Sequence, residues 1–334
     1  MNSAPFITVS LAALLLTGNA AGQTPDTVES HIVAARAAAG TDYRNTLLNL
    51  CPLFPAASGT GRGRGALPLT APRPAPDRAT WYASPYKIFD NLYWLGTRQH
   101  SSWALQTSAG IIIIDTNFAW ATEPEIVDGL TKLGLNPRDI KYVIISHAHG
   151  DHDQGAAELQ NRYGAKVVMG GPDWDSTLQR APDVAGGVPK RDISVGPEGT
   201  KVTLGDTTVN IVFTPGHSVG TLSYTFPVKD QGRTIQVAYS GGTLTGAFGA
   251  DGARWDEYVA SQQKIAAAAA AAGATVILSN HSEYDNAYAK ARLIPAKREA
   301  GETHPFIVGT ESVQRYFTVM QECAMAAKLR NIAK

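Results

Sequence analysis

Short apolar runs rich in β-forming residues alternate with segments of helical periodicity over most of the chain. This alternation is typical of an α/β domain, in which helices cover a sheet. The apolar runs predict strands at residues 92–95, 103–106, 111–114, 142–145, 166–169, 209–214, 235–239 and 276–278. The helical pattern predicts helices at residues 27–50, 122–133, 154–163 and 256–272.

Local signals predict where several of these helices begin and end. Thr122 reads as a capping residue, because Pro124 fits the first turn and Glu125 follows three residues after the cap. Gly134, Gly164 and Gly273 stand where the helices should stop.

The first residues resemble an export signal. Phe6–Leu16 is an apolar stretch that is too short to span a bilayer, and small residues follow it up to Gly22. No basic residue precedes this stretch, so a buried N-terminal helix is the alternative. We expect a signal peptide at residues 1–22 and a periplasmic or secreted protein with no stable membrane anchor.

Residues 23–80 are expected to form an N-terminal helix and an arm rich in proline and glycine, and residues 81–334 the main domain. The two cysteines, Cys51 and Cys323, lie far apart in sequence. In an oxidising compartment they can form one disulfide between the arm and the C-terminal helix. Two unpaired buried thiols remain the alternative, because pairing geometry cannot be read from sequence.

The net charge of the chain bears on whether it binds nucleic acid or membranes. Lysine plus arginine and aspartate plus glutamate both number 29, so no net charge attracts nucleic acid or an anionic membrane. We expect a small-molecule substrate. The sequence does not indicate an oligomeric state.

The segment Ser146–His152 contains three histidines and one aspartate and directly follows the strand predicted at 142–145. His147 and His149 stand two residues apart, so both side chains can point the same way from an extended loop. Asp151 and His152 follow a glycine and can face a second centre nearby. Imidazole and carboxylate without thiolate suit zinc or a similar divalent ion.

Two further histidines follow predicted strands in the same manner. His217 comes after the strand at 209–214, within Thr214–His217, and His281 comes after the strand at 276–278. Loops at one edge of a rigid sheet are a common position for functional residues. We therefore expect both histidines to join the cluster.

In combination, these motifs resemble the metallo-β-lactamase superfamily, and within it subclass B3 most closely. The resemblance covers roughly residue 81 to the end and implies an αββα sandwich that holds two zinc ions. It assigns His147, His149 and His217 to the first ion and Asp151, His152 and His281 to the second. Asp115 matches the strand-end aspartate that supports the metal site, with Asn117 where the family usually has glycine.

Many hydrolases of the superfamily carry a bridging aspartate after the strand that corresponds to 235–239. This chain has Gly241–Thr245 there and no acid. Subclass B3 enzymes place a Ser-Leu-Ser-like segment at that point, and Thr243 and Thr245 offer the same hydroxyls. Tyr284 is a further candidate for substrate contact. The candidate aromatic walls of the site are Trp103, Trp120, Trp174 and Tyr284.

The resemblance implies a hydrolase in which metal-bound hydroxide attacks a carbonyl, with Asp151 orienting the nucleophile and handling its proton. A β-lactam, a cyclic amide, is the first substrate hypothesis. A related hydrolase acting on a lactone, ester or other amide is the alternative. A non-catalytic metal-binding protein is a third hypothesis, which the full ligand set disfavours.

Overall fold

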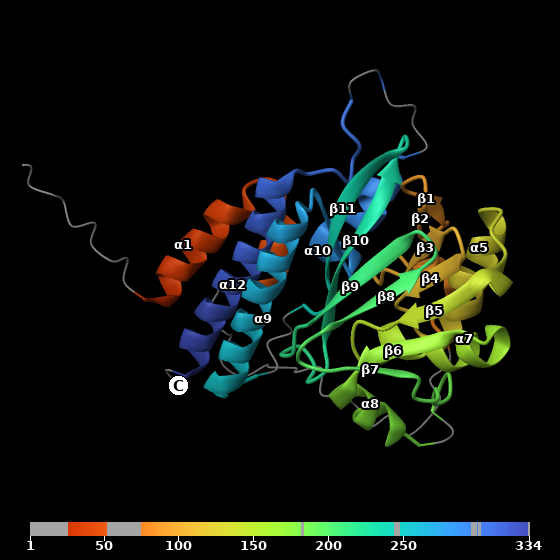
Figure 1. Ribbon diagram of the computed structural model, residues 1–334. Coiled ribbons are helices and arrows are strands. Elements are labelled where there is room, and N and C mark those ends of the chain that lie inside the picture. The colour runs from red at the N-terminus through yellow and green to blue at the C-terminus, as the bar shows by residue number, and fades with distance from the viewer. Residues whose placement is uncertain are drawn as a thin grey trace, which may run out of the picture.

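The computed structural model describes residues 26–51, 75–181, 184–243, 248–294, 299 and 302–332. Over these residues, two facing β-sheets lie between two layers of helices (Figure 1). The predicted αββα class is therefore confirmed.

The first sheet has seven strands in sequential order, and the second has five. The first contains β1 Tyr86–Lys87, β2 Leu92–Trp94, β3 Trp103–Thr107, β4 Gly110–Ile114, β5 Ile140–Ile144, β6 Lys166–Gly170 and β7 Ile193–Val195. The second, in the order β12-β11-β10-β9-β8, contains β8 Thr200–Leu204, β9 Thr207–Phe213, β10 Leu222–Asp230, β11 Arg233–Ser240 and β12 Val276–Ser279.

The wholly apolar strands are buried on both faces, as β4 shows. Ile112 and Ile114 point into the core between the sheets. Ile111 and Ile113 point the other way, into the core beneath the helices. Successive side chains of a strand face opposite sides, so a strand that is covered on both sides needs four apolar residues in a row.

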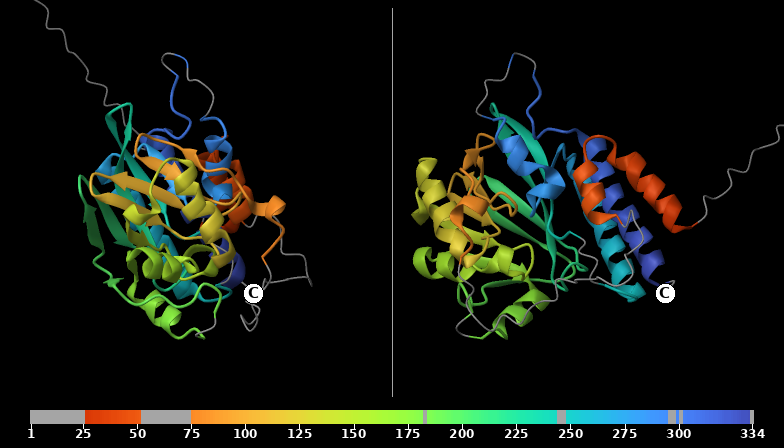
Figure 2. Two further views of the ribbon diagram at one scale, coloured as in Figure 1. Left: turned by 90° about the vertical axis from the view of Figure 1, so that its right-hand side faces the viewer. Right: turned by 180° about the vertical axis from the view of Figure 1, so that it is seen from behind.

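Each sheet has its own helical cover (Figures 1 and 2). The first sheet is covered by α5 Asp128–Lys132, α7 Ala156–Tyr163 and α8 Gly171–Leu178. The second is covered by α9 Gly252–Ala272 and α12 Thr310–Ile332, and α1 Val28–Ala39 and α2 Arg44–Leu50 pack against α12. The remaining short helices are α3 Arg78–Trp81, α4 Ala119–Ala121, α6 Gly150–Asp153, α10 Ser282–Asp285 and α11 Ala287–Ala291. A π-helical turn spans Thr122–Val127, and a 3-10 turn spans Pro137–Asp139.

The N-terminal helix differs from the expectation. The single helix predicted at 27–50 is two helices, because the chain leaves helical geometry at Gly40 with φ 51° before α2 begins. Thr27 caps α1 by accepting a hydrogen bond from the Ser30 backbone N–H. Helix α1 packs along α12, and a Cys51–Cys323 disulfide joins the end of α2 to α12. Of the two alternatives for the cysteines, the structure has the disulfide.

Thr122 is not the predicted helix cap. The helical segment already begins after Phe118, and the buried Thr122 hydroxyl donates to the carbonyls of Thr116 and Phe118 from inside it. A buried threonine that bonds the preceding turn loses its capping role. Gly134, Gly164 and Gly273 do follow helices, all with positive φ.

The predicted signal peptide and most of the proline-rich arm lie outside the described residues. The expected domain boundary after residue 80 falls inside α3. Among the helices of the described chain, none combines the length and the apolar character that a membrane span requires.

Candidate metal centre

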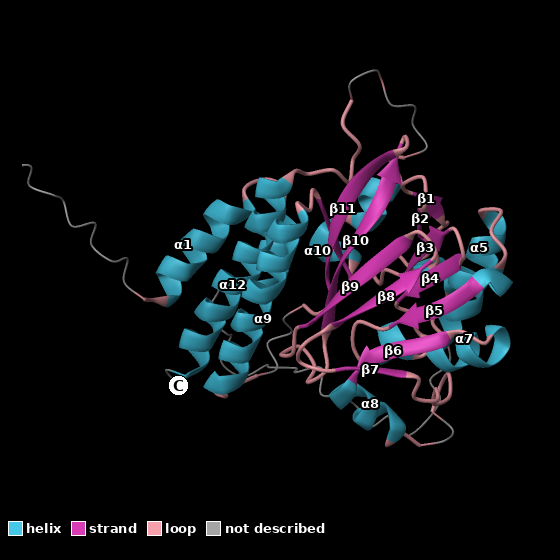
Figure 3. Cartoon of the chain, viewed as in Figure 1, coloured by secondary structure: helices cyan, strands magenta, loops and turns pink. Residues whose placement is uncertain are grey.

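The predicted ligands come from the ends of strands in both sheets. The loop that carries His147 and His149 follows β5, and Asp151 and His152 lie in α6 directly after it. His217 follows β9 and His281 follows β12 in the other sheet. These connections are the loops drawn in pink in Figure 3. The structure brings all six predicted ligands together.

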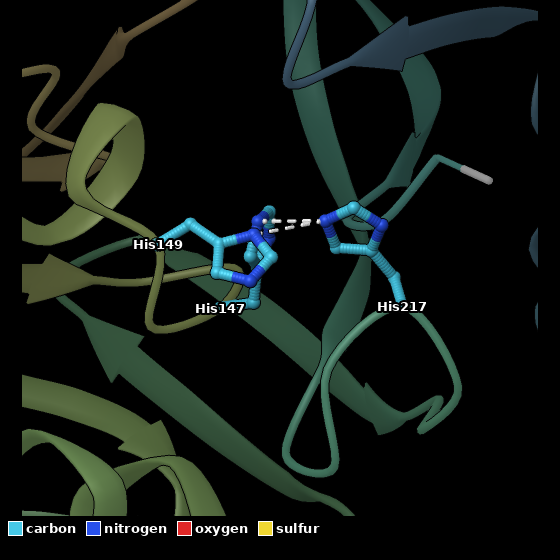
Figure 4. Close-up of side chains that lie close together, drawn as sticks. All are labelled: His147, His149 and His217. Atoms are coloured by element: carbon cyan, nitrogen blue, oxygen red, sulfur yellow. Dashed lines mark hydrogen bonds between the residues drawn. The ribbon is translucent and has the colours of Figure 1, made fainter. Parts of the chain in front are cut away.

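His147, His149 and His217 form the first cluster, whose ring nitrogens converge on one point (Figure 4). The Nε2 atom of His217 lies 3.1 Å from His147 Nε2 and 3.1 Å from His149 Nδ1. Zinc–nitrogen bonds of about 2.0–2.1 Å in a tetrahedron place ligand atoms roughly 3.3 Å apart. The spacing of this cluster therefore fits a zinc ion.

The second cluster adjoins the first, and the rings of His147 and His152 are 4.4 Å apart. Asp151 Oδ2 lies 3.2 Å from His152 Nε2 and 3.3 Å from His281 Nε2. The two imidazole Nε2 atoms are themselves 3.2 Å apart. These separations again match the edges of a zinc tetrahedron, about 3.3 Å.

His147 is held in one orientation by the segment after β11. Its Nδ1 lies 2.9 Å from the Gly241 carbonyl oxygen, which also accepts a bond from the Asn280 amide. A carbonyl acceptor places the ring proton on Nδ1 and leaves Nε2 free for a metal. Gly241 cannot be replaced easily, because an added Cβ would lie 1.6 Å from the Leu222 carbonyl oxygen.

Asp115, the aspartate that the resemblance assigns to the support of the metal site, is buried next to His152 of the second cluster. It accepts hydrogen bonds from the Ser146 N–H at 2.6 Å and from the Tyr239 hydroxyl at 2.9 Å. Its Oδ2 also lies 3.2 Å from His152 Nδ1, so it can orient that imidazole. Asn117 has φ 59°, a left-handed conformation that asparagine tolerates and that glycine adopts freely.

Asp173 of α8 joins the two loops that form the first cluster. Its carboxylate accepts from the Ala148 N–H at 2.8 Å, the Ser218 hydroxyl at 2.7 Å and the Gly220 N–H at 2.9 Å. Arg180 donates to the Ala148 carbonyl at 2.7 Å and pairs with the buried Asp153. The spacing between His149 and His217 therefore depends on a residue that touches neither ring.

The two clusters differ in charge. Burial and neighbouring imidazoles hold the pKa of His147 well below its usual value and lower that of His217 to about 3. In the second cluster, burial opposes the charge of Asp151, but His152 and His281 outweigh it and hold the carboxyl pKa well below its usual value. The first cluster is thus neutral, whereas the second carries a carboxylate.

A pocket of about 710 Å³ opens above the clusters. Its wall contains Trp81, Phe118, Trp120, Tyr284 and the exposed Arg98. Thr243 also lines the pocket, and its side chain is hydrogen-bonded to Tyr284.

The prediction that Trp103 and Trp174 line the site is wrong. Trp103 and Trp174 are fully buried, Trp103 in the core between the sheets and Trp174 on the inner side of α8, in the core under the helices of the first sheet. Thr245 lies outside the described residues.

Sequence reasoning missed several residues of the site: His100, Asp173, Arg180, Glu283, Trp81 and Phe118. Asp173 had a usable signal, because an acid just past β6 lies at the same sheet edge as the His147 loop. His100 had none, since a lone histidine in a polar turn before a strand resembles any surface residue.

A family model of the metallo-beta-lactamase superfamily matches residues 95–267. The match covers just over half of the chain, and the chain belongs to this superfamily. The clusters described above are built from residues within this match together with His281.

Solved structures place the chain near one subclass. It is similar to BJP-1, a subclass B3 metallo-beta-lactamase of Bradyrhizobium japonicum, at 31% identity and TM-score 0.61, over 74% of this chain and 94% of that one. The metallo-beta-lactamase GOB-18 from Elizabethkingia meningoseptica shares the fold at 21% identity and TM-score 0.60, over 76% and 95% of the chains.

Among curated proteins, the chain is similar to a hydroxyacylglutathione hydrolase of Rhodopseudomonas palustris. The identity is 28% over 214 residues, which cover 61% of this chain and 78% of that protein. The two comparisons agree on a hydrolase of this superfamily and point to different substrates.

Proposed function

We propose that this protein is an exported dizinc hydrolase that opens the ring of a β-lactam. The observation that carries the proposal is the pair of adjoining clusters, whose donor atoms have the spacing of two zinc tetrahedra at the floor of one pocket. Two zinc ions bound there supply a water that is activated near neutral pH and a positive charge beside the scissile carbonyl.

Residues of the chain would supply the proton transfer and the hydrogen bonds to the substrate. Asp151 stays ionised beside His152 and His281, so its carboxylate can accept a proton from the attacking water. It can then return that proton to the leaving nitrogen. Thr243 lines the pocket, and its hydroxyl oxygen can take part in a hydrogen bond with the substrate.

The pocket wall suits a rigid bicyclic substrate with a carboxylate. Phe118 and Trp120 stack with ring centroids 5.1 Å apart, and Trp81 lies 4.6 Å from Trp120. These rings provide an apolar face for a fused ring system. Arg98 at the same pocket offers the guanidinium that a carboxylate requires.

A second substrate class is supported by the curated relatives, which are named hydroxyacylglutathione hydrolases. A thioester, lactone or other ester would use the same metals and the same general base. Against this class, the described part of the segment after β11 ends at Thr243 and carries no carboxylate.

A substrate panel decides between the classes. Purified zinc-loaded protein should hydrolyse a chromogenic cephalosporin, lose this activity to a chelator and regain it with zinc. Penicillins, carbapenems, a hydroxyacylglutathione thioester and simple lactones complete the panel. His149→Ala is the matched inactive control. Turnover of only the thioester or the lactones would reject the β-lactam proposal and retain the dizinc hydrolase.

Export is tested separately. Expression of the full chain in a Gram-negative host should place it in the periplasmic fraction. Mass spectrometry of that protein should find a mature N-terminus near Gln23. An intact N-terminus in the cytoplasm would reject the signal peptide.

A further inference from the structure

His100 lies beside the second cluster although no metal motif contains it. The backbone places it there, because residues 99–101 pair with residues 280–282. The Ser101 N–H donates to the Asn280 carbonyl at 2.9 Å, and the Ser282 N–H donates to the Gln99 carbonyl at 2.7 Å. His100 and His281 form the β-bridge between them, and their rings are 5.0 Å apart.

The ring of His100 is oriented by its other nitrogen. Nδ1 lies 3.2 Å from the Thr97 hydroxyl, which also accepts a bond from the His100 backbone N–H at 2.9 Å. Phe118 packs edge-on against the ring at 5.1 Å. These contacts direct Nε2 towards Asp151, in the manner that outer contacts orient metal-binding imidazoles.

The Nε2 atom of His100 lies 3.6 Å from Asp151 Oδ2. That separation is too long for a hydrogen bond, so it does not account for the position of the ring. It is close to the distance between two ligands of one zinc ion, about 3.3 Å. The donor atoms of His100, Asp151 and His281 all lie within 4.8 Å of one another.

We propose that His100 is a fourth protein ligand of the second metal ion, beside Asp151, His152 and His281. Three imidazoles and one carboxylate would then hold this ion, which is the number of protein ligands in a closed zinc site. The first ion keeps only three protein ligands and a free position. The proposal rests on the metal centre of the proposed function and not on its substrate.

This arrangement assigns different roles to the two ions. The first site, with three protein ligands, would leave a position open for water or substrate. The second site, with four protein ligands, would hold its ion more tightly. His100→Ala should therefore weaken the second site and leave the first one intact.

Measurements of metal affinity test the role of His100 without the use of catalytic activity. Metal-free wild type, His100→Ala and His100→Gln are titrated with zinc against a chromogenic chelator, and with Co²⁺ while the visible absorption is followed. His31→Gln is the matched control, because His31 of α1 lies in the helical layer, paired with Glu322 of α12. Circular dichroism and thermal melting of the metal-free forms establish that each variant is folded.

We expect the second zinc of His100→Ala to bind at least about tenfold more weakly, with the first unchanged. The Co²⁺ spectrum of the second site should lose intensity, as expected when a tetrahedral site gains water. Both variants binding two ions with wild-type affinity and spectrum would overturn the proposal and leave the dizinc centre standing. A wild type that holds only one ion would overturn both.

Discussion

The first and second clusters lie side by side, yet their ligands are held in position by different means. The three imidazoles of the first cluster are neutral, and uncharged backbone groups and Asp173 fix the loops that carry them. The second cluster combines a carboxylate with imidazoles and is bordered by Asp115 and Glu283. The geometry of the loops therefore contributes most to the position of the ligands in the first cluster, and electrostatic attraction contributes more in the second.

Removal of one ligand from each cluster should give the largest effects. His217→Ala should lose the first zinc ion, because two remaining protein ligands hold zinc poorly. His281→Ala should bind the second zinc ion much more weakly, because that site loses one of its imidazoles. Activity on the substrate found by the panel should fall by about a thousandfold or more, since both ions act on one substrate. Metal analysis after dialysis, together with kcat/KM, measures both effects.

If the clusters are independent, each variant keeps the ion of the other cluster. A variant that loses both ions would show that one ion is needed to form the second site. His304→Gln is a suitable reference, because His304 is buried beside Ile88, away from the pocket-lining residues.

Substitution of the carboxylates that support the clusters should have smaller effects, each on the zinc affinity of one cluster. Asp173→Asn replaces one acceptor oxygen by a donor between Ala148 and Gly220, and should weaken the first zinc by about 10–100-fold. Asp115→Asn should weaken the second zinc by a similar factor, because Asp115 contacts His152 directly. Chelator competition with each ion measures the two affinities. Equal weakening of both sites by Asp173→Asn would contradict the division between the clusters.

A pH effect on stability should arise from Asp285, which lies four residues after His281. Asp285 accepts from the Ser279 N–H at 2.7 Å and the Ala287 N–H at 2.8 Å, on either side of His281. Burial raises its pKa to about 7. The folded protein thus keeps a proton that the unfolded chain has already released, and stability falls as the pH rises from about 4 to about 7.

Asp285→Asn mimics the protonated carboxyl and lacks this part of the pH dependence. In metal-free protein, its melting temperature relative to wild type should rise by about 5 °C between pH 5 and pH 8. Thermal melts at both values measure the difference. A constant difference at the two values would mean that Asp285 is ionised throughout.

The comparison also shows what the sequence can reveal. All three residues of the first cluster could be predicted, because two lie in one dense motif and His217 follows a strand after Pro215 and Gly216. Ile111–Ile114 likewise predicted a strand buried on both faces, since four apolar residues leave no polar side. His100 could not be found, because its position depends on the pairing of two distant segments. Trp103 and Trp174 were misplaced for a related reason: an aromatic residue alone does not indicate which face of its element is buried.

The smallest expected effect concerns Glu283, which borders the second cluster from the solvent side. Its Oε1 lies 3.7 Å from His281 Nδ1 and accepts a bond from the Gln99 amide at 3.2 Å. The nearby His281 and Gln99 outweigh burial and lower the Glu283 pKa, so the side chain is charged at neutral pH. A carboxylate–imidazole contact that is partly exposed to solvent contributes less than about 1 kcal/mol, so Glu283→Gln should weaken the second zinc by about twofold to fivefold. Chelator competition at low and high salt measures the change, with the exposed Glu257→Gln on α9 as the control.

If charge does sustain the second cluster, the difference in zinc affinity between Glu283→Gln and wild type shrinks as the salt concentration rises. A difference of the same size at both salt concentrations would assign the effect to geometry and remove the contrast between the clusters.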